Sequence, residues 1–371
     1  MLFFNNIESY LERNSNIPFS ELPFNEIDSL VLCELIYADL SGIVPENGIV
    51  SIPDVRKRFF RKHSRSKLRR QLIYFARAPL MLDAMADGAR YSSMKVRDYV
   101  KIIDDKADIQ MTAVTFLPDD GTAFVCFSGT DKTISGWKED FNFSYMKETE
   151  GQRLAVKYLN DAACMTDRPL RAGGHSKGAN FAVYASSFVN RDIQDRIIDI
   201  YALDGPGFRE EITRTENYRR IVPKVKSIVP EESIIGQLLV HDYKDIVVKS
   251  SGIGILQHDG FTWCLEHNKF IRSKLSNNAK FFRDAQTDWL AKMDDKAREA
   301  FVTILFAPLE ATKMSSLDEI YTKRMEAAIS ILDSLNDMTP EEHRSMRVFL
   351  QELFRSCGVK AIESALTDIR K

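Results

Sequence analysis

Gly174-His175-Ser176-Lys177-Gly178 lies near the middle of this 371-residue chain and indicates its fold class. A short apolar run, 170–173, precedes it, and residues 180–189 follow with a helical pattern. A strand, a sharp turn and a helix in this order expose the serine hydroxyl, because glycines on both sides let strand and helix approach closely. Ser176 is therefore a candidate nucleophile. The alternative is that Ser176 only caps the following helix.

The segments around this pentapeptide alternate between strand and helix patterns. Residues 109–117 and 122–127 are predicted strands joined by turn residues, and we expect this hairpin to open the sheet. Further strands are predicted over 197–203, 225–229 and 246–250, and further helices over 152–161, 210–218 and 234–240. Such alternation predicts an α/β fold with a doubly wound, mostly parallel sheet whose ligand cleft lies beyond the strand carboxyl ends.

The composition of the chain divides it into four segments. Residues 1–54 are predicted to form a helical layer on the core. Residues 55–100 are predicted to be a basic helical insertion that serves as a lid, with a helical hairpin that runs through Tyr99. Residues 101–276 are the predicted α/β core, and residues 277–371, which are charged and almost free of glycine, are a predicted helical extension.

Charge and cysteine content exclude several classes of function. A net charge of −2 argues against a general nucleic-acid binder. The cysteines are odd in number, widely separated and without a C-x-x-C pair, which fits neither a disulfide framework nor a zinc site: Cys33, Cys126, Cys164, Cys264 and Cys357. We therefore expect reduced thiols and no metal or organic cofactor. No signal peptide or membrane span is recognisable, so we expect a cytoplasmic protein.

A serine nucleophile needs a histidine base and an acid, and both follow Ser176 in the chain. In hydrolases with this motif the order is serine, acid, histidine, each from a loop after a strand. Asp204 directly follows the predicted strand 197–203, and His258 lies beyond the last predicted strand. Glu231 and Glu232 follow the intervening strand and are the alternative acids. We favour Asp204, but the order alone does not exclude the other two.

Two segments can supply an oxyanion hole. One N–H comes from the residue after the nucleophile, Lys177, and another from the loop after the strand that ends at Phe127. In that loop Thr130 is the candidate donor, through its backbone, its hydroxyl or both, and Asp140 is expected to hold the loop in place. A cation in a first helical turn opposes the helix dipole, so the Lys177 side chain is a candidate to hold an anionic group of the substrate. The alternative is a solvated or locally paired lysine.

Several motifs resemble those of known families. Residues 127–131 (Phe-Ser-Gly-Thr-Asp) and 136–141 (Gly-Trp-Lys-Glu-Asp-Phe) look like the oxyanion segment of class 3 lipases. Together with residues 174–180, 204–208 and 257–259, they resemble a bacterial α/β-hydrolase family of unknown function related to those lipases, over residues 24–265. The resemblance implies an α/β-hydrolase fold with Ser176, Asp204 and His258 as a triad.

The chain departs from the pattern of that family at two positions. Ser128 stands where arginine is usual, which puts the order of the oxyanion loop in doubt, and Ala179 replaces a glycine on the helix after Ser176. Alanine is still small enough for the turn to close. The family has no known substrate to carry over.

The segment from Arg56 to Arg70 contains nine lysines and arginines and no acidic residue. Phe59, Phe60 and Leu68 are interleaved with these cations, as in a helix that lies on an anionic membrane surface. The alternative is a solvated face, and nucleic-acid binding is a weaker third option. The lipid interpretation places the cytoplasmic protein at the periphery of a membrane.

These patterns predict a serine hydrolase that cleaves an ester or related acyl bond of a small molecule or a lipid. Ser176 attacks the carbonyl, His258 relays the proton and Asp204 holds the imidazole. Thr130 and Lys177 stabilise the oxyanion. The lipase-like oxyanion segment and the predicted lid favour lipid esters. The alternatives are a catalytically silent hydrolase fold that serves binding or regulation, and a membrane-surface adaptor.

Overall fold

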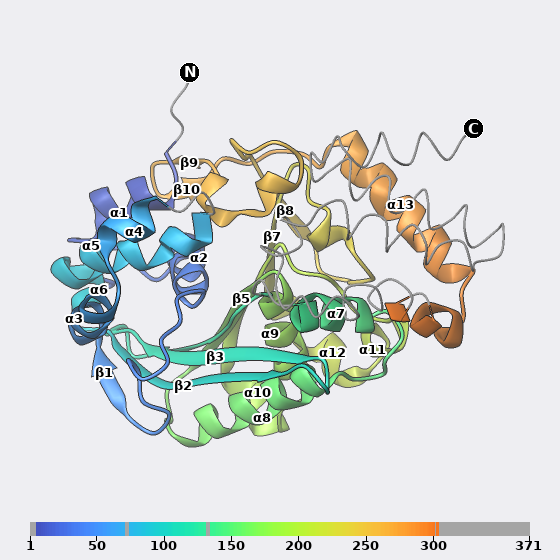
Figure 1. Ribbon diagram of the computed structural model, residues 1–371, viewed down its shortest axis with the longest axis horizontal. Helices are drawn as coiled ribbons and strands as arrows, with labels where there is room; N and C mark the ends of the chain where they lie inside the picture. The colour runs from blue at the N-terminus through green and yellow to red at the C-terminus, as the bar shows by residue number, and fades with distance from the viewer. Residues whose placement is uncertain (1–4, 71–73, 131–133, 301, 304–371) are drawn as a thin grey trace.

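A mostly parallel sheet lies between two layers of helices in the computed structural model, which describes residues 5–70, 74–130, 134–300 and 302–303 (Figure 1). Eight strands of the described residues form it, in chain order: β1 (Ile49–Ser51), β2 (Lys95–Asp104), β3 (Ile109–Leu117), β4 (Ala123–Phe127), β5 (Leu170–His175), β6 (Ile197–Leu203), β7 (Val225–Pro230) and β8 (Asp245–Val248). The pairs from β1 to β4 are antiparallel and those from β4 to β8 are parallel. This is the α/β-hydrolase-like architecture expected from the sequence.

Most of the helices between β4 and β7 share one face of the sheet. They are α8 (Glu150–Cys164), α9 (Lys177–Phe188), α10 (Arg191–Arg196), α11 (Glu210–Thr213), α12 (Glu216–Ile221) and the 3-10 turn η2 (Val222–Lys224). Right-handed crossovers between strands in sequential order place their helices on the same side. Their apolar side chains form one hydrophobic core with that face of the sheet.

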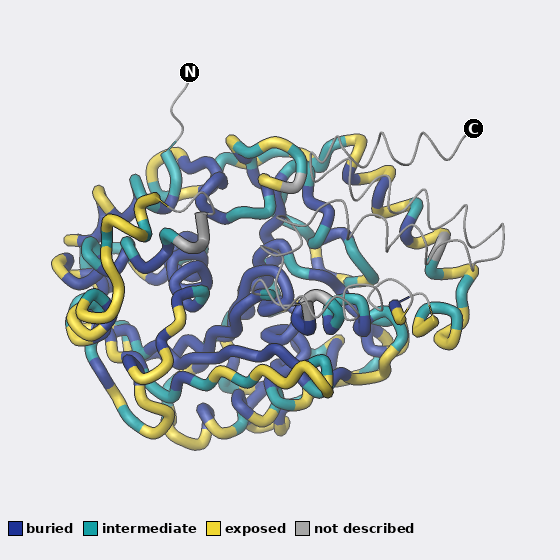
Figure 2. The backbone as a smooth tube through the Cα atoms, viewed as in Figure 1, coloured by how far each residue is buried: buried dark blue, intermediate teal, exposed yellow. Residues whose placement is uncertain are grey.

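Helices from the amino-terminal part of the chain cover the other face. They are α1 (Ile7–Asn14), α2 (Glu26–Leu35), α3 (Ile52–Lys62), α4 (Arg65–Arg69), α5 (Met81–Asp87), α6 (Ala89–Ser92) and the 3-10 helix η1 (Tyr74–Leu80). Apolar residues of α3, α5 and α6 join those of α1 and α2 in one hydrophobic core, and Figure 2 shows how burial varies along these helices. The described helices of 55–100 therefore extend the layer formed by 1–54.

The start of the sheet differs from the prediction. The hairpin of β3 and β4 exists, but β1 and β2 precede it, and β2 occupies residues that we predicted to be helical. Its register shifts between Arg97 and Val100, where Asp98 has a φ of 55°. Such a bulge interrupts the two-residue alternation that identifies a strand, so this strand is not recognisable from the sequence. The predicted boundary at residue 100 falls inside β2.

Short elements and one long helix follow β7 in the chain. They are β9 (Leu265–Glu266), β10 (Lys269–Phe270), α13 (Asn277–Ala291) and the 3-10 turns η3 (Ile235–Gln237), η4 (Gly254–His258) and η5 (Gly260–Thr262). Most of the predicted helical extension, residues 304–371, lies outside the described residues. Among the helices that are described, none combines the length and apolar character needed to cross a membrane.

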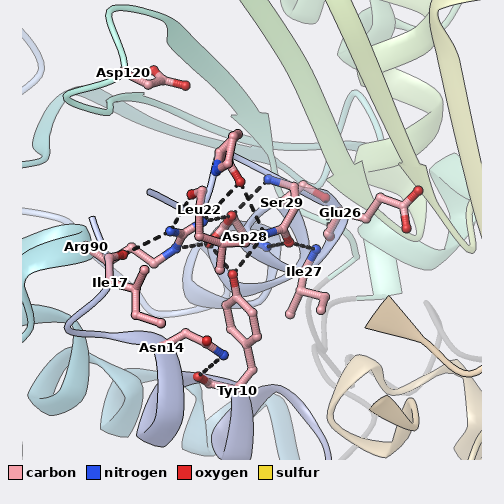
Figure 3. Close-up of polar contacts among 12 residues, drawn as sticks. Tyr10, Asn14, Ile17, Leu22, Glu26, Ile27, Asp28, Ser29, Arg90 and Asp120 are labelled. Atoms are coloured by element: carbon pink, nitrogen blue, oxygen red, sulfur yellow. Dashed lines mark hydrogen bonds and ion pairs between the residues drawn. The ribbon is translucent and has the colours of Figure 1, made fainter. Parts of the chain in front are cut away.

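A buried ion pair holds the amino-terminal layer together (Figure 3). The Arg90 guanidinium makes two hydrogen bonds to the Asp28 carboxylate, of 2.8 and 2.5 Å, and both side chains are fully buried. Arg90 also donates to the carbonyl oxygens of Ile17 and Leu22. Asp28 in turn accepts from the hydroxyl of Tyr91, at 2.5 Å. The pair thereby joins α6, α2 and the loop before α2.

Replacement of Arg90 tests this arrangement. We expect Arg90→Leu to lower the free energy of unfolding by about 3–5 kcal/mol, because Asp28 would remain buried without its counter-ion. Arg65→Leu is the matched control: Arg65 also forms a two-bond pair with Asp83, but their side chains are 41% and 37% exposed. That change should cost no more than about 1 kcal/mol. Equal losses in urea unfolding would contradict the structural role of the buried pair.

Candidate active site

Ser176 occupies the sharp turn between β5 and α9. Its backbone has a φ of 57° and a ψ of −130°, a conformation that residues other than glycine rarely adopt. The flanking glycines are required by close contacts: a Cβ on Gly174 would lie 2.2 Å from the backbone of Gly178, and one on Gly178 would lie 2.1 Å from the carbonyl oxygen of Phe127. The turn is held by a 2.9 Å hydrogen bond from the Ser176 amide to Leu203.

His258 and Asp204 meet beyond the carboxyl ends of the parallel strands. The His258 Nδ1 lies 2.7 Å from Asp204 Oδ2, and the aspartate is buried. The other carboxylate oxygen accepts hydrogen bonds from the Ser233 hydroxyl and from the Gly236 amide, the latter at 3.2 Å. Because a carboxylate only accepts, His258 donates from Nδ1, and its Nε2 is the nitrogen left to face a nucleophile.

The two alternative acids have other partners. The Glu232 carboxylate accepts a 2.8 Å hydrogen bond from the Gly254 amide, at the start of η4. The Glu231 carboxylate accepts from the Ser273 hydroxyl. No hydrogen bond to His258 is formed by either glutamate in the described part of the chain. The acid beside the histidine is therefore the one that follows β6, and Glu232 fixes the start of the turn that carries His258.

Ser176 makes no hydrogen bond to His258 in the described structure. The ring of His175, which directly precedes the serine, has its centroid 4.5 Å from that of the His258 ring. His258 therefore lies beside the residue that precedes the serine. A hydrogen bond between nucleophile and base often forms only once substrate binds.

The loop after β4 packs directly against the serine. A Cβ on Gly129 would lie 3.0 Å from the Ser176 Cβ, so only glycine fits there. The Thr130 hydroxyl donates a 2.6 Å hydrogen bond to Asp140, on α7 (Ile134–Asn142). Burial raises the pKa of Asp140 to about 6, against the opposing effects of Lys177 and Thr130. Because the hydroxyl is engaged, the backbone amide of Thr130 is the donor left for an oxyanion.

The structure decides between the two interpretations of the Lys177 side chain. The side chain is fully buried, with Nζ 3.0 Å from the Glu139 carboxylate and 3.3 Å from the Gly136 carbonyl oxygen. The hypothesis that it holds an anionic group of the substrate is therefore wrong, and local pairing explains a cation at this helix terminus. The Lys177 amide is the first of α9, and such amides have no acceptor within the helix. It remains available to an oxyanion.

The two departures from the family pattern are accommodated locally. Ser128 is buried, its amide donates a 2.9 Å hydrogen bond to Thr112, and its hydroxyl donates to the Gly129 carbonyl oxygen at 3.2 Å. The Ala179 methyl group packs against Gly205, where an added Cβ would lie only 2.4 Å away. The glycine of the Asp204 turn therefore leaves room for the alanine of the helix.

Comparison with known protein families gives one match. The model of the Mbeg1-like family matches residues 85–307, which is more than half of the chain and includes Ser176, Asp204 and His258. This protein belongs to the Mbeg1-like family. No curated protein matches it significantly. No cluster of three or more potential metal ligands occurs among the described residues.

Three solved structures are similar to this Mbeg1-like protein at low sequence identity. M37 lipase has 13% identity, a TM-score of 0.38 and coverage of 58% of this chain and 70% of its own. The native propeptide complex of Rhizomucor miehei lipase has 15% identity, a TM-score of 0.33 and coverage of 45% of this chain and 58% of its own. A mutant form of MDLA from Penicillium cyclopium has 12% identity, a TM-score of 0.40 and coverage of 70% of this chain and 89% of its own. Because these TM-scores are low, the fold of this protein is assigned from the order and pairing of its own strands.

The site of this Mbeg1-like protein contains a buried hydrogen-bonded chain that the sequence did not indicate. The His175 Nε2 lies 2.7 Å from the carbonyl oxygen of His258, and its Nδ1 lies 2.7 Å from the hydroxyl of Tyr37, just beyond α2. A carbonyl oxygen only accepts, so Nε2 carries the proton and Nδ1 accepts from the tyrosine. His175 thereby fixes the backbone of the residue whose side chain pairs with Asp204.

Burial disfavours charge on the ionisable groups of this hydrogen-bonded series. Desolvation, and then the nearby His258, lower the pKa of His175 well below its ordinary value. The Glu34 carboxyl lies 3.9 Å from His175 Nδ1, and burial, together with the charge of Asp259, raises the pKa of this carboxyl well above its usual range. His175 is therefore neutral at neutral pH, without a proton on Nδ1, and its surroundings disfavour a charged carboxylate at Glu34. The second histidine of the site serves as a fixed neutral donor rather than as a base.

The tautomer of His175 can be observed directly. In long-range ¹H–¹⁵N NMR spectra, we expect the Nε2–H form without titration between about pH 6 and 8, because burial lowers the pKa of His175 well below the ordinary histidine value. Tyr37→Phe should retain this tautomer, since the His258 carbonyl still fixes it, but should cost about 1–3 kcal/mol of stability by leaving Nδ1 unsatisfied. A protonated Nδ1, or titration within this range, would contradict the hydrogen-bond assignment.

Proposed function

We propose that this Mbeg1-like protein is a serine hydrolase that cleaves an ester or related acyl bond. The observation that carries the proposal is the 2.7 Å contact between His258 Nδ1 and Asp204, beside a serine held at a φ of 57°. Such a backbone conformation is costly and is typically kept where it serves a function. Asp204 and His258 also follow the serine in the chain order of hydrolases with this motif.

The proposed reaction uses these groups in two steps. Ser176 Oγ attacks the carbonyl carbon of the ester while His258 Nε2 takes its proton, and Asp204 stabilises the resulting imidazolium. The amides of Lys177 and Thr130 stabilise the negative charge that develops on the carbonyl oxygen. His258 then gives the proton to the departing alcohol, which leaves an acyl group on Ser176. Water, activated by the same histidine, releases the acid.

The loop that carries His258 supports an apolar acyl group. Ile253 and Leu256, which lie just before the histidine, are 81% and 61% exposed. Exposed large apolar side chains next to a reactive group commonly contact a ligand. We therefore propose an ester with an aliphatic acyl chain, as in a lipid, as the substrate class.

One observation favours a second candidate, a catalytically silent hydrolase fold that binds a ligand. In the described structure, Ser176 makes no hydrogen bond to His258, so the serine is not yet activated by the histidine. A silent fold predicts no turnover of any ester even though the protein is folded. The reactivity of Ser176 therefore separates the two candidates.

Replacement of the acid distinguishes Asp204 from Glu232. We expect Asp204→Asn to lower kcat for a p-nitrophenyl ester by about 10³–10⁴-fold with little change in KM, because the amide favours the wrong histidine tautomer. Glu232→Gln is the matched control. Its amide oxygen still accepts from Gly254, so kcat should fall by less than about tenfold. A larger loss in Glu232→Gln than in Asp204→Asn, with both variants folded, would overturn the assignment of the acid.

A further inference from the structure

The exposed cations of α3, α4 and the residue after α4 form a surface that we call the basic face. Its members are Lys57, Arg58, Arg61, Lys62, Lys67, Arg69 and Arg70. The opposite side of α3 is apolar and buried, through Ile52, Val55 and Phe59. The cations therefore all point away from the core, while the apolar residues of the same helix anchor it to the protein.

Most of the charge on this face has no counter-ion. Neighbouring Arg56 and Arg65, which are less exposed, pair with Asp87 and Asp83 at 2.5 and 2.6 Å. Six members of the basic face form no ion pair within the described residues: Lys57, Arg61, Lys62, Lys67, Arg69 and Arg70. A concentration of unpaired cations this close together creates a positive potential that attracts anions.

The surface is slightly hollowed between the cations. A shallow depression of about 470 Å³ is lined by Pro53, Asp54, Lys57, Arg61 and the Phe60 ring, together with the paired Arg56 and Arg65. The Arg65 guanidinium covers the Phe60 ring, with its central carbon 3.6 Å from the ring centroid. The lining carries four cations against the single carboxylate of Asp54, and the depression is open to solvent, which suits a headgroup phosphate rather than an apolar ligand.

We propose that the basic face binds the anionic headgroups of a lipid membrane. Phe59 is buried and Phe60 is covered by Arg65, so neither of these two rings is offered for insertion between acyl chains or for stacking on a nucleotide base. Binding rests on charge alone, so it depends on anionic lipid and weakens with salt.

A membrane also fits the proposed substrate class, but the two proposals are independent. The basic face contains no residue of the site around Ser176. Binding to anionic vesicles should therefore persist in Ser176→Ala. If hydrolysis fails while vesicle binding holds, only the hydrolase proposal is lost, and the protein is then the membrane-surface adaptor.

Vesicle flotation tests the proposal. We expect the protein to float with vesicles of phosphatidylcholine and one-third phosphatidylglycerol, and not with pure phosphatidylcholine. The double variant Lys57→Glu, Arg61→Glu should reduce binding by about tenfold or more. The matched control is Lys280→Glu with Lys292→Glu, which makes the same charge change on and just after α13, at the opposite end of the molecule (Figure 1). The control should bind like the unaltered protein.

Three results would overturn the proposal. Binding to pure phosphatidylcholine as strong as to the anionic mixture would exclude a charge-based site. Equal loss in both double variants would show an effect of net charge rather than of this face. Binding of a short DNA duplex without vesicle binding would identify nucleic acid as the partner. A second pair on the same face, Lys67→Glu with Arg69→Glu, should repeat the loss and guards against misfolding of the first.

Discussion

The close approach of backbone segments around Ser176 is the constraint on which the rest of the site depends. The positive φ of the serine costs about 1–3 kcal/mol, and it persists only because the surrounding structure determines it. Gly129 and Gly205 bring the oxyanion loop and the Asp204 turn against the serine, and Gly178 brings α9 against the end of β4, at distances that exclude any side chain. One tight turn therefore sets the positions of the nucleophile, the oxyanion donors and the acid.

Electrostatics and burial then assign different roles to similar groups. Of the two histidines beside the serine, His258 bonds to the buried Asp204, whereas His175 is surrounded by neutral partners and acts through the backbone of His258. The side chain and the backbone of Lys177 likewise have different roles. The side chain is paired with the Glu139 carboxylate, and the amide is available to an oxyanion in the site. His258 and Lys177 are thus paired with carboxylates, whereas burial disfavours charge on His175.

The sequence predicted those strands and turns whose residue pattern is set within a short stretch of chain. The bounds of β3 and β6 agree with the predicted strands, because β3 has the alternating pattern of a strand and β6 is mainly apolar. The strand, turn and helix around Ser176 also followed from local pattern, whereas residue order left Glu231 and Glu232 as alternatives to Asp204. The contacts of His175 with Tyr37, and of Lys177 with Glu139, join residues 138 and 38 positions apart, and no local pattern encodes such pairs. The bulge in β2 likewise depends on its pairing with β3 and hid that strand from prediction.

The central claim is that Ser176 is an activated nucleophile. The most direct measurement is the intact mass of the purified protein after reaction with a fluorophosphonate, with Ser176→Ala as the comparison. The account predicts a single adduct on the unaltered protein, formed at Ser176, and none on Ser176→Ala. An unlabelled but folded protein, or an adduct of the same extent on Ser176→Ala, would contradict it.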